Sequence, residues 1–460
     1  MDVSKSDLGS LTATQAVELM RWNHVSARDY ARALLDRIRE RDPQVRAWIY
    51  LNEEAVLEQA DNLDRIPPEK RGPLHGVAVG IKDVFLTQDM PTRYNSRLHA
   101  NDGNAAADSA AVSVLRAAGA IILGKTATTE FAAMTEGRPC TNPNNPKHTP
   151  GGSSSGSAAA VADYQVPVSI GTQTGGSIVR PASFNGCYGF KPTWGTISTE
   201  GVGRYAVSAD TPGFCARSVD DLELLARLFD LDSLFAEPFA PMSIKGARIA
   251  FIKTPVWPAA GPGTRAAWDL AHELLADNGA AIQDVELPAV FSNCASWRDL
   301  VIASEARAAF LPSKYTTQQV EYRQDKSKIH SDIVRLIENK ALPSRKQLLE
   351  AHDGIARLRS IWDRFATKYD IIITPSAIDE APEGLGDTGT AVRPTTHCVD
   401  TIKAFCAMWT ILHVPAMNVP GFKGQRGLPI GLTVVGSRYS DMEVLRGGKA
   451  VGAIFNGQPS

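Results

Sequence analysis

A glycine- and serine-rich stretch spanning residues 150–177 constrains this chain more than any other part of it. Six glycines and five serines lie between Pro150 and Ser177, around an alanine-rich core at residues 158–162. Glycine lets the backbone approach other groups closely or adopt a positive φ, and serine supplies hydroxyl groups. A flexible linker can share this composition. However, the alanine-rich core predicts a helix and Val166–Gly171 predicts a strand, and neither belongs in a linker.

The rest of the chain predicts an α/β fold. Helical spacing of apolar residues covers residues 11–65, 105–118 and 295–370, whereas short runs of β-branched residues predict buried strands. These predicted strands are Val77–Lys82, 121–123, Val166–Gly171, 370–375 and Leu428–Gly436. Strands that alternate with helices indicate a mixed sheet sandwiched between helices.

We expect a single large domain over residues 1–460. Its expected parts are N-terminal helices at 1–66, a core at 67–240, a helical insertion or lid at 295–370, and the rest of the core at 371–460.

Composition excludes several classes of function. The chain has 460 residues and a net charge of −2, so it lacks the basic surface expected of a protein that binds nucleic acid or an anionic membrane. Its six cysteines are scattered and form no C-x-x-C pair, which argues against a disulfide framework or a zinc ribbon. The N-terminal residues show no secretory signal pattern. A cytoplasmic location is therefore expected.

One motif matches a phosphate-binding P-loop by its letters. Residues 119–126 read G-A-I-I-L-G-K-T, but the four residues between the glycines are typical of a strand and a predicted helix precedes them. A P-loop requires a strand, then a loop, then a helix. The sequence context therefore disfavours nucleotide binding through Lys125.

A second motif matches a nucleophile elbow. Residues 152–156 read G-S-S-S-G, with Ser154 at the position of the nucleophile. An elbow directly follows a hydrophobic strand, whereas residues 142–150 contain three prolines and three asparagines and predict a loop. His397 and His413 lie downstream, but nothing in the sequence pairs either one with an acid. An elbow-type hydrolase is therefore disfavoured as well.

A third arrangement consists of one lysine and two serines. Lys82 ends a predicted buried strand, and Ser153 and Ser177 each follow two glycines. A serine hydroxyl needs an adjacent base to become a nucleophile. A buried lysine can be that base, because burial favours the neutral amine. From spacing alone, Lys82 could equally be a surface charge and the serines ordinary turn residues.

The glycine- and serine-rich stretch resembles the amidase signature family, as do several motifs outside it. The family's lysine strand is matched by residues 74–83, its serine segments by 150–160 and 171–178, and its later motifs by 189–193, 415–420 and 427–432. The likeness runs from about residue 10 to residue 455 and implies the α/β fold described above. It also implies cleavage of a C–N bond at a carbonyl group without a metal or an organic cofactor.

This resemblance assigns roles to individual residues. It implies that Ser177 is the nucleophile, that Ser153 is a bridging serine after a cis peptide bond, and that Lys82 is the base. The backbone N–H groups of Thr174, Gly175, Gly176 and Ser177 would then hold the oxyanion.

Two departures from the commoner family pattern are Ser155 in place of glycine and Gln173 in place of aspartate. The arginine after the nucleophile is shifted by one place to Arg180, which could bind a polar group of the substrate or support the site structurally.

The substrate is less constrained than the mechanism. We expect a stand-alone hydrolase of a small-molecule amide, aryl amide or carbamate (urethane), possible as a homodimer, with no nucleic-acid or membrane partner. An A-type subunit of a tRNA-dependent amidotransferase is the alternative within the family. The residues proposed to line the substrate pocket are Ala132, Met134, Arg180, Tyr94, Trp297 and Trp409. The 295–370 region could gate access to the site.

Overall fold

The computed structural model describes residues 8–133, 139–231, 241–310, 326–338, 343–384 and 405–457. A mixed sheet of eleven strands runs through these residues in the order β1-β3-β2-β4-β6-β5-β10-β11-β9-β7-β8. The strands are β1 (Trp48–Leu51), β2 (Ala78–Lys82), β3 (Ile121–Thr126), β4 (Val168–Gln173), β5 (Tyr188–Lys191), β6 (Thr211–Ala216), β7 (Arg248–Ile252), β8 (Ala281–Val285), β9 (Ile371–Pro375), β10 (Ala416–Lys423) and β11 (Pro429–Val435).

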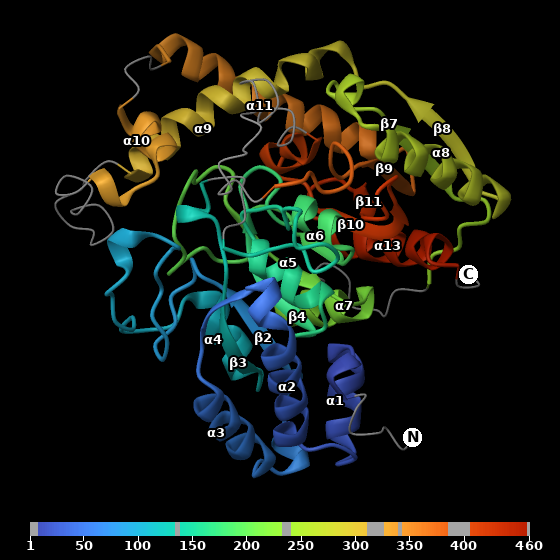
Figure 1. Ribbon diagram of the computed structural model, residues 1–460. Helices are drawn as coiled ribbons and strands as arrows, with labels where there is room; N and C mark the ends of the chain where they lie inside the picture. The colour runs from blue at the N-terminus through green and yellow to red at the C-terminus, as the bar shows by residue number, and fades with distance from the viewer. Residues whose placement is uncertain are drawn as a thin grey trace.

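Helices surround this sheet (Figure 1). They are α1 (Ala13–Arg21), α2 (Ala27–Val45), α3 (Glu53–Asp64), α4 (Ala110–Ala117), α5 (Ser155–Ala162), α6 (Val179–Asn185), α7 (Val219–Leu228), α8 (Pro262–Asp277), α9 (Cys294–Phe310), α10 (Ser331–Glu338), α11 (Arg345–Ala366) and α13 (Asp441–Phe455). Helices α1, α2 and α3 gather at one end of the molecule, and α9, α10 and α11 form an arch at the other end. The predicted single α/β domain with a mixed sheet between helices is confirmed.

The three strands that precede the catalytic candidates lie side by side. Strand β2 pairs in parallel with β3 on one side and with β4 on the other, with Ile81 opposite Lys125 and Ile170. Parallel neighbours end at the same edge of a sheet. Lys82, at the end of β2, is therefore brought to the edge where β4 ends and the Ser177 turn begins.

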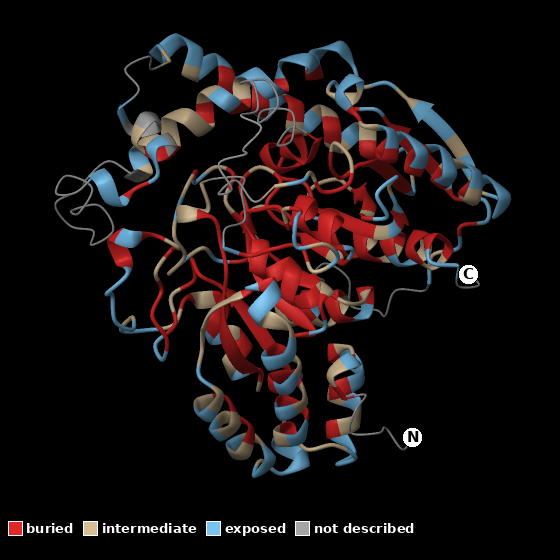
Figure 2. Ribbon diagram, viewed as in Figure 1, coloured by how far each residue is buried: buried red, intermediate tan, exposed pale blue. Residues whose placement is uncertain are grey.

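Helices α5 and α6 follow the two serine-bearing turns, and every residue of them except Ala162 is buried (Figure 2). Small side chains let α5 sit deep in the fold. A Cβ atom at Gly156 would lie 2.2 Å from the Ala47 carbonyl oxygen and 2.4 Å from the Ala127 nitrogen, so this position of α5 requires glycine. The predicted alanine-rich helix is thus a core helix that packs closely against its neighbours.

Several predicted elements need correction. Residues 11–65 were expected to be helical throughout, but β1 interrupts them and pairs antiparallel with β3. The helix expected at 105–118 spans only 110–117. Strands β5, β6, β7, β8 and β10 were not predicted. The helical character expected for 295–370 is confirmed where the structure describes that region, in α9, α10 and α11.

None of the helices in the described residues is both long enough and apolar enough to cross a bilayer.

Candidate active site

Lys82, Ser153 and the β4 residue Thr172 form a buried hydrogen-bonded group. Lys82 Nζ donates to Ser153 Oγ at 2.8 Å and to Thr172 Oγ1 at 2.7 Å, with the Thr172 carbonyl oxygen 3.4 Å away. The lysine side chain has no solvent exposure. Burial lowers the pKa of Lys82 to about 7, whereas the charge of Asp210 acts to raise it. A large fraction of this lysine is therefore neutral near pH 7 and able to accept a proton.

Ser153 follows a cis peptide bond from Gly152, as the family resemblance implied. The Gly152 carbonyl accepts a hydrogen bond from Arg180 Nη2, and the Ser153 carbonyl accepts one from the Thr129 N–H at 3.2 Å. These contacts hold the backbone on both sides of the bond, so that Ser153 Oγ faces Lys82.

Ser177 sits in the turn between β4 and α6. Its carbonyl accepts a hydrogen bond from the Ser154 N–H at 3.2 Å, which joins the two serine turns. Ser177 is 9% exposed, compared with 1% for Ser153. Of the three sequence-predicted catalytic side chains, Ser177 is thus the one with most access to a substrate.

The backbone of this turn is suited to hold an oxyanion. Within the described part of the chain, the N–H groups of Gly175, Gly176 and Ser177 have no hydrogen-bond partner. A Cβ atom added to Gly175 would meet no atom within 4 Å. Open space and unpaired N–H groups at one turn are the features expected of an oxyanion hole.

Gln173 explains one departure from the commoner family pattern. Its Oε1 accepts hydrogen bonds from the Ile178 and Val179 N–H groups, at 2.8 and 3.0 Å, at the start of α6. Its Nε2 donates to Thr410 Oγ1 at 2.9 Å, and that hydroxyl donates to the Gly175 carbonyl at 2.6 Å. The amide thus fixes both ends of the nucleophile turn. Sequence analysis assigned no role to Thr172, although it lies within the 171–178 motif, and missed Thr410 and Asp210, which lie in no recognised motif.

Arg180 lies under the turn and is only 2% exposed. Besides its bond to Gly152, its Nε and Nη1 atoms have no hydrogen-bond partner among the described residues. A Cβ atom at Gly176 would lie 3.2 Å from Arg180 Nη1. The structure therefore places Arg180 between the two serine turns, and a direct contact with substrate stays a prediction.

A small cavity adjoins the catalytic group. Ala132, Thr172, Thr174 and Asp210 line it, together with residues of the segment 199–212. Among the predicted lining residues, Ala132 lies at this cavity, whereas Met134 lies outside the described residues.

Two of the remaining predicted lining residues pack at the helical arch instead. Trp409 is fully buried, with its ring 4.7 Å from the Trp362 ring. Trp297 packs over Gly354 of α11. Neither lines the small cavity. Tyr94 packs in the main core next to Gly203, which is itself a cavity residue.

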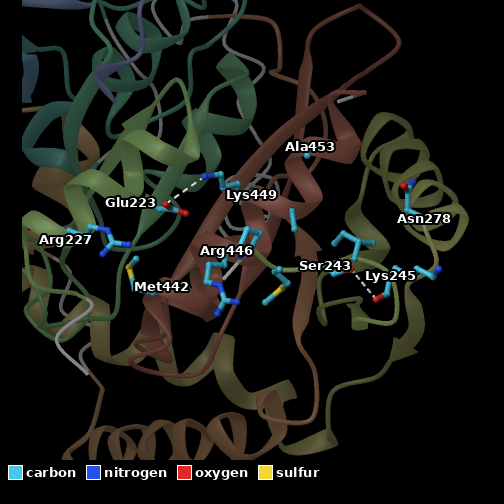
Figure 3. A pocket seen from close by; sticks show the side chains of 13 residues that line it. Glu223, Arg227, Ser243, Lys245, Asn278, Met442, Arg446, Lys449 and Ala453 are labelled. Carbon is cyan, nitrogen blue, oxygen red and sulfur yellow. Dashed lines mark hydrogen bonds and ion pairs between the residues drawn. The ribbon is translucent and has the colours of Figure 1, made fainter. Parts of the chain in front are cut away.

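A larger cavity lies elsewhere, between α7, α13 and the segment 241–245 (Figure 3). Apolar residues such as Met442 and Ala450 line it, and Lys449 at its rim pairs with Asp220 and Glu223. Lys82, Ser153 and Ser177 line neither cavity. The smaller cavity is the one that adjoins the catalytic group, because Thr172, which bonds to Lys82, and Thr174 of the nucleophile turn both line it.

Lys125, the lysine of the P-loop-like motif, has a structural environment. It lies inside β3, its Nζ donates to the Phe85 carbonyl at 2.5 Å and to Thr92 Oγ1 at 2.7 Å, and it lies 3.8 Å from the Asp83 carboxylate. Residues 121–126 are strand rather than loop. This segment therefore lacks the phosphate-binding loop that a P-loop requires. The structure gives no support to nucleotide binding through Lys125.

Lys125→Met is expected to destabilise the fold by about 3–5 kcal/mol, because it leaves the buried Asp83 carboxylate without its cation. Urea unfolding followed by fluorescence would measure the loss as a lower midpoint. The double variant Lys125→Met/Asp83→Asn should recover part of that stability. Equal midpoints for wild type and Lys125→Met would contradict a structural role for the pair.

Comparison with known proteins identifies the family. The model of the Amidase family matches residues 29–445. The chain belongs to this family. A curated relative from Acidothermus cellulolyticus, the A subunit of glutamyl-tRNA(Gln) amidotransferase, is 32% identical over 98% of this chain and 95% of its own length.

Two solved structures share the fold. One belongs to a vestigial protein complex described as revealing the origins of an s-triazine catabolic enzyme. It has a TM-score of 0.83 at 27% identity and covers 96% of this chain and 98% of its own. The other is the peptide amidase of Stenotrophomonas maltophilia, with a TM-score of 0.78 at 26% identity and 96% coverage of both chains. The predicted membership of the amidase signature family is confirmed.

Proposed function

We propose that this amidase-family protein hydrolyses C–N bonds at a carbonyl group through an acyl-enzyme on Ser177. The observation that carries this proposal is the 2.8 Å contact between Lys82 Nζ and Ser153 Oγ in a fully buried setting. Because burial lowers the pKa of Lys82 to about 7, the neutral amine is available to take a proton from Ser153. Ser153 is in turn the residue that would deprotonate Ser177.

We propose that these three side chains act in the following order. Ser177 Oγ attacks the carbonyl carbon while its proton passes to Ser153, whose own proton passes to Lys82. The backbone N–H groups of residues 174–177 hold the oxyanion. The C–N bond then breaks, and the leaving amine receives the proton through Ser153. Water attacks the acyl-enzyme by the same route and releases the acid.

The cavity beside Thr174 bears on the substrate. Its wall includes the apolar side chains of Val202, Val207 and Pro212, with hydroxyl groups of Thr199 and Thr211 among them. Apolar walls with a few polar groups are typical of sites for small organic ligands, but this cavity has a volume of only about 20 Å³, so its wall would have to move for an acyl or aryl group to enter. From the character of this wall, and not from its size, we propose a small-molecule amide, aryl amide or carbamate as substrate, and we expect no nucleic acid as a partner.

A second candidate rests on the relatives. Proteins 30–32% identical over more than nine-tenths of this chain carry the name of the glutamyl-tRNA(Gln) amidotransferase A subunit. In such a role the Ser177 site would release ammonia from an amide donor and work together with partner proteins. Balanced charge on this chain, at −2 overall, favours the stand-alone hydrolase over a tRNA-handling assembly.

Product release from a panel of substrates tests the proposal. The panel holds a short-chain nitroanilide, a long-chain nitroanilide, an aryl carbamate, a small primary amide and glutamine. Mass spectrometry of the intact protein, quenched during turnover, would detect the acyl group as added mass, and digestion would place it on the peptide that contains Ser177. Hydrolysis with acyl-enzyme formation supports the proposal, and the ranking of rates names the substrate class.

Two results would argue against a stand-alone hydrolase. Ammonia release from glutamine alone would favour the amidotransferase role. Absence of turnover and of acylation with every panel member would contradict the proposal.

A further inference from the structure

Asp210 makes contacts that link the cavity wall to the nucleophile turn. Its carboxylate accepts hydrogen bonds from Thr174 Oγ1 at 2.5 Å, from the Tyr205 N–H at 2.8 Å and from the Ala206 N–H at 3.0 Å. The two backbone bonds fix the carboxylate on its own loop. The third bond therefore ties Thr174, the first residue of the predicted oxyanion segment, to that loop.

The same carboxylate lies close to the buried lysine, because Asp210 lines the same cavity as Thr172, whose hydroxyl accepts a hydrogen bond from Lys82 Nζ at 2.7 Å. The groups whose charge bears on Lys82 are Asp210 and the Cys215 thiol of β6. Asp83 follows Lys82 in sequence, but its carboxylate interacts with other groups. It accepts hydrogen bonds from the Arg93 and Asn95 N–H groups and forms an ion pair with Lys125. Asp210 is thus the carboxylate that acts on Lys82.

Asp210 interacts with a second carboxylate as well as with Lys82. The charge of Glu305 in α9 acts to raise the pKa of Asp210. The Glu305 carboxylate accepts hydrogen bonds from the Ser208 N–H and hydroxyl, both at 2.9 Å. Burial raises the pKa of Asp210 to about 6, while the hydrogen bond from Thr174 acts to lower it. At pH 7 and above, Asp210 is therefore mainly ionised.

We propose that Asp210 is a positioning residue of the Ser177 site with two effects. Its hydrogen bond to Thr174 orients the oxyanion-binding turn, and its negative charge sets the pH range in which Lys82 can act as a base. The inference rests on the proposed function, because it assigns Asp210 a role in activating Ser177.

Labelling of Ser177 by a fluorophosphonate tests this inference without knowledge of the substrate. In that reaction Ser177 Oγ forms a bond to phosphorus, fluoride leaves, and the serine proton passes to the base. The labelling rate would be measured from pH 5 to pH 10 on wild type, Asp210→Asn and Asp441→Asn.

Asp441 is a matched control. It is a buried carboxylate that accepts a threonine hydroxyl at 2.6 Å and a backbone N–H at 2.7 Å, both from Thr193, and its charge acts on the buried Lys191. This arrangement repeats that of Asp210 away from Ser177. Any general cost of removing a buried carboxylate should therefore appear in both variants.

Asp210→Asn is expected to shift the acid limb of the labelling profile to lower pH by about one unit, because the charge that favours protonated Lys82 is gone. The plateau rate should also fall, by about tenfold, a part of what loss of a complete oxyanion donor costs. The acid limb of the labelling profile of Asp441→Asn should lie at the same pH as that of wild type.

A second pair of variants covers the case in which Asp210→Asn fails to fold. Thr174→Val removes the hydroxyl that donates a hydrogen bond to Asp210, whereas Thr174→Ser retains it. The valine variant should label about tenfold more slowly, and the serine variant should label at nearly the wild-type rate.

The outcomes separate the inference from the proposed function. Wild type that fails to label at any pH, or that labels equally after Ser177→Ala, would refute the proposed function. Two results would overturn the role of Asp210 but leave the proposed function standing. One is a wild type that labels with the same acid limb in its pH profile as Asp210→Asn. The other is equal labelling rates for Thr174→Val and Thr174→Ser.

Discussion

Ser177→Ala is expected to slow hydrolysis of every panel substrate by about 10⁴-fold or more, because removal of a nucleophile leaves only binding and the oxyanion hole. The change should leave the fold intact. Ser177 joins the neighbouring turn through its backbone carbonyl, and Gln173 holds the start of α6 independently of the hydroxyl. Steady-state rates, with circular dichroism as the folding check, would measure this effect.

Ser154→Ala is the matched control for that experiment. Ser154 is the serine of the elbow-like motif, and its hydroxyl bonds to the Thr172 backbone rather than to Lys82. The variant should keep most of its activity. A reversed result, in which Ser154→Ala is inactive and Ser177→Ala is active, would favour the elbow-type hydrolase.

Lys82→Met is expected to lower the hydrolytic rate by about 10⁴-fold or more, because a serine hydroxyl without its base is a poor nucleophile. In wild type the rate should rise with pH through about 7, where the pKa of Lys82 lies. The rate rises with pH because below that pKa the Lys82 amine is protonated and unable to accept a proton. Profiles of kcat/KM against pH, which report the free enzyme, would measure the midpoint.

Lys125→Met is the control for Lys82→Met, because it shows how much of the lost rate comes from removing any buried lysine. Lys125 is also fully buried, but its amine bonds to the Phe85 carbonyl and to Thr92 rather than to a catalytic serine. At a temperature where the variant is folded, its kcat/KM profile should keep the wild-type acid limb. A Lys82→Met enzyme with an unchanged profile would contradict the role of Lys82 as the base.

The sequence predicted the fold best where a buried strand carries a run of β-branched residues. Strands β2, β3, β4, β9 and β11 contain such runs, and each coincides with a predicted strand to within a few residues. Strand β6 (Thr211–Ala216) is buried throughout but was missed, because its T-P-G-F-C-A sequence has no such run. Strand β1 was missed because its residues are half-buried at an edge of the sheet. Strand β10 contains Pro420 and Gly421, which weaken any local strand signal. Its place depends on pairing with β5 and β11.

The site divides in a similar way. Lys82, Ser153 and Ser177 lie in motifs that a reader of the sequence can recognise, although their proximity was implied by family resemblance rather than by spacing. Asp210 and Thr410 were beyond reach, because each acts through a contact 36 or 235 residues away along the chain. Such contacts exist only after the sheet has formed.

The distribution of the site along the chain bears on how its selectivity can change. The proposed chemistry comes from residues 82–177, whereas much of the cavity wall comes from the later segment 199–212. Substitutions in that later segment can reshape what the protein accepts while the reactive atoms keep their places. Asp210 is the exception, because it belongs to the wall and also supports the reaction. Mutagenesis for new substrates would therefore do best to vary Val202, Val207 and Pro212 and to retain Asp210.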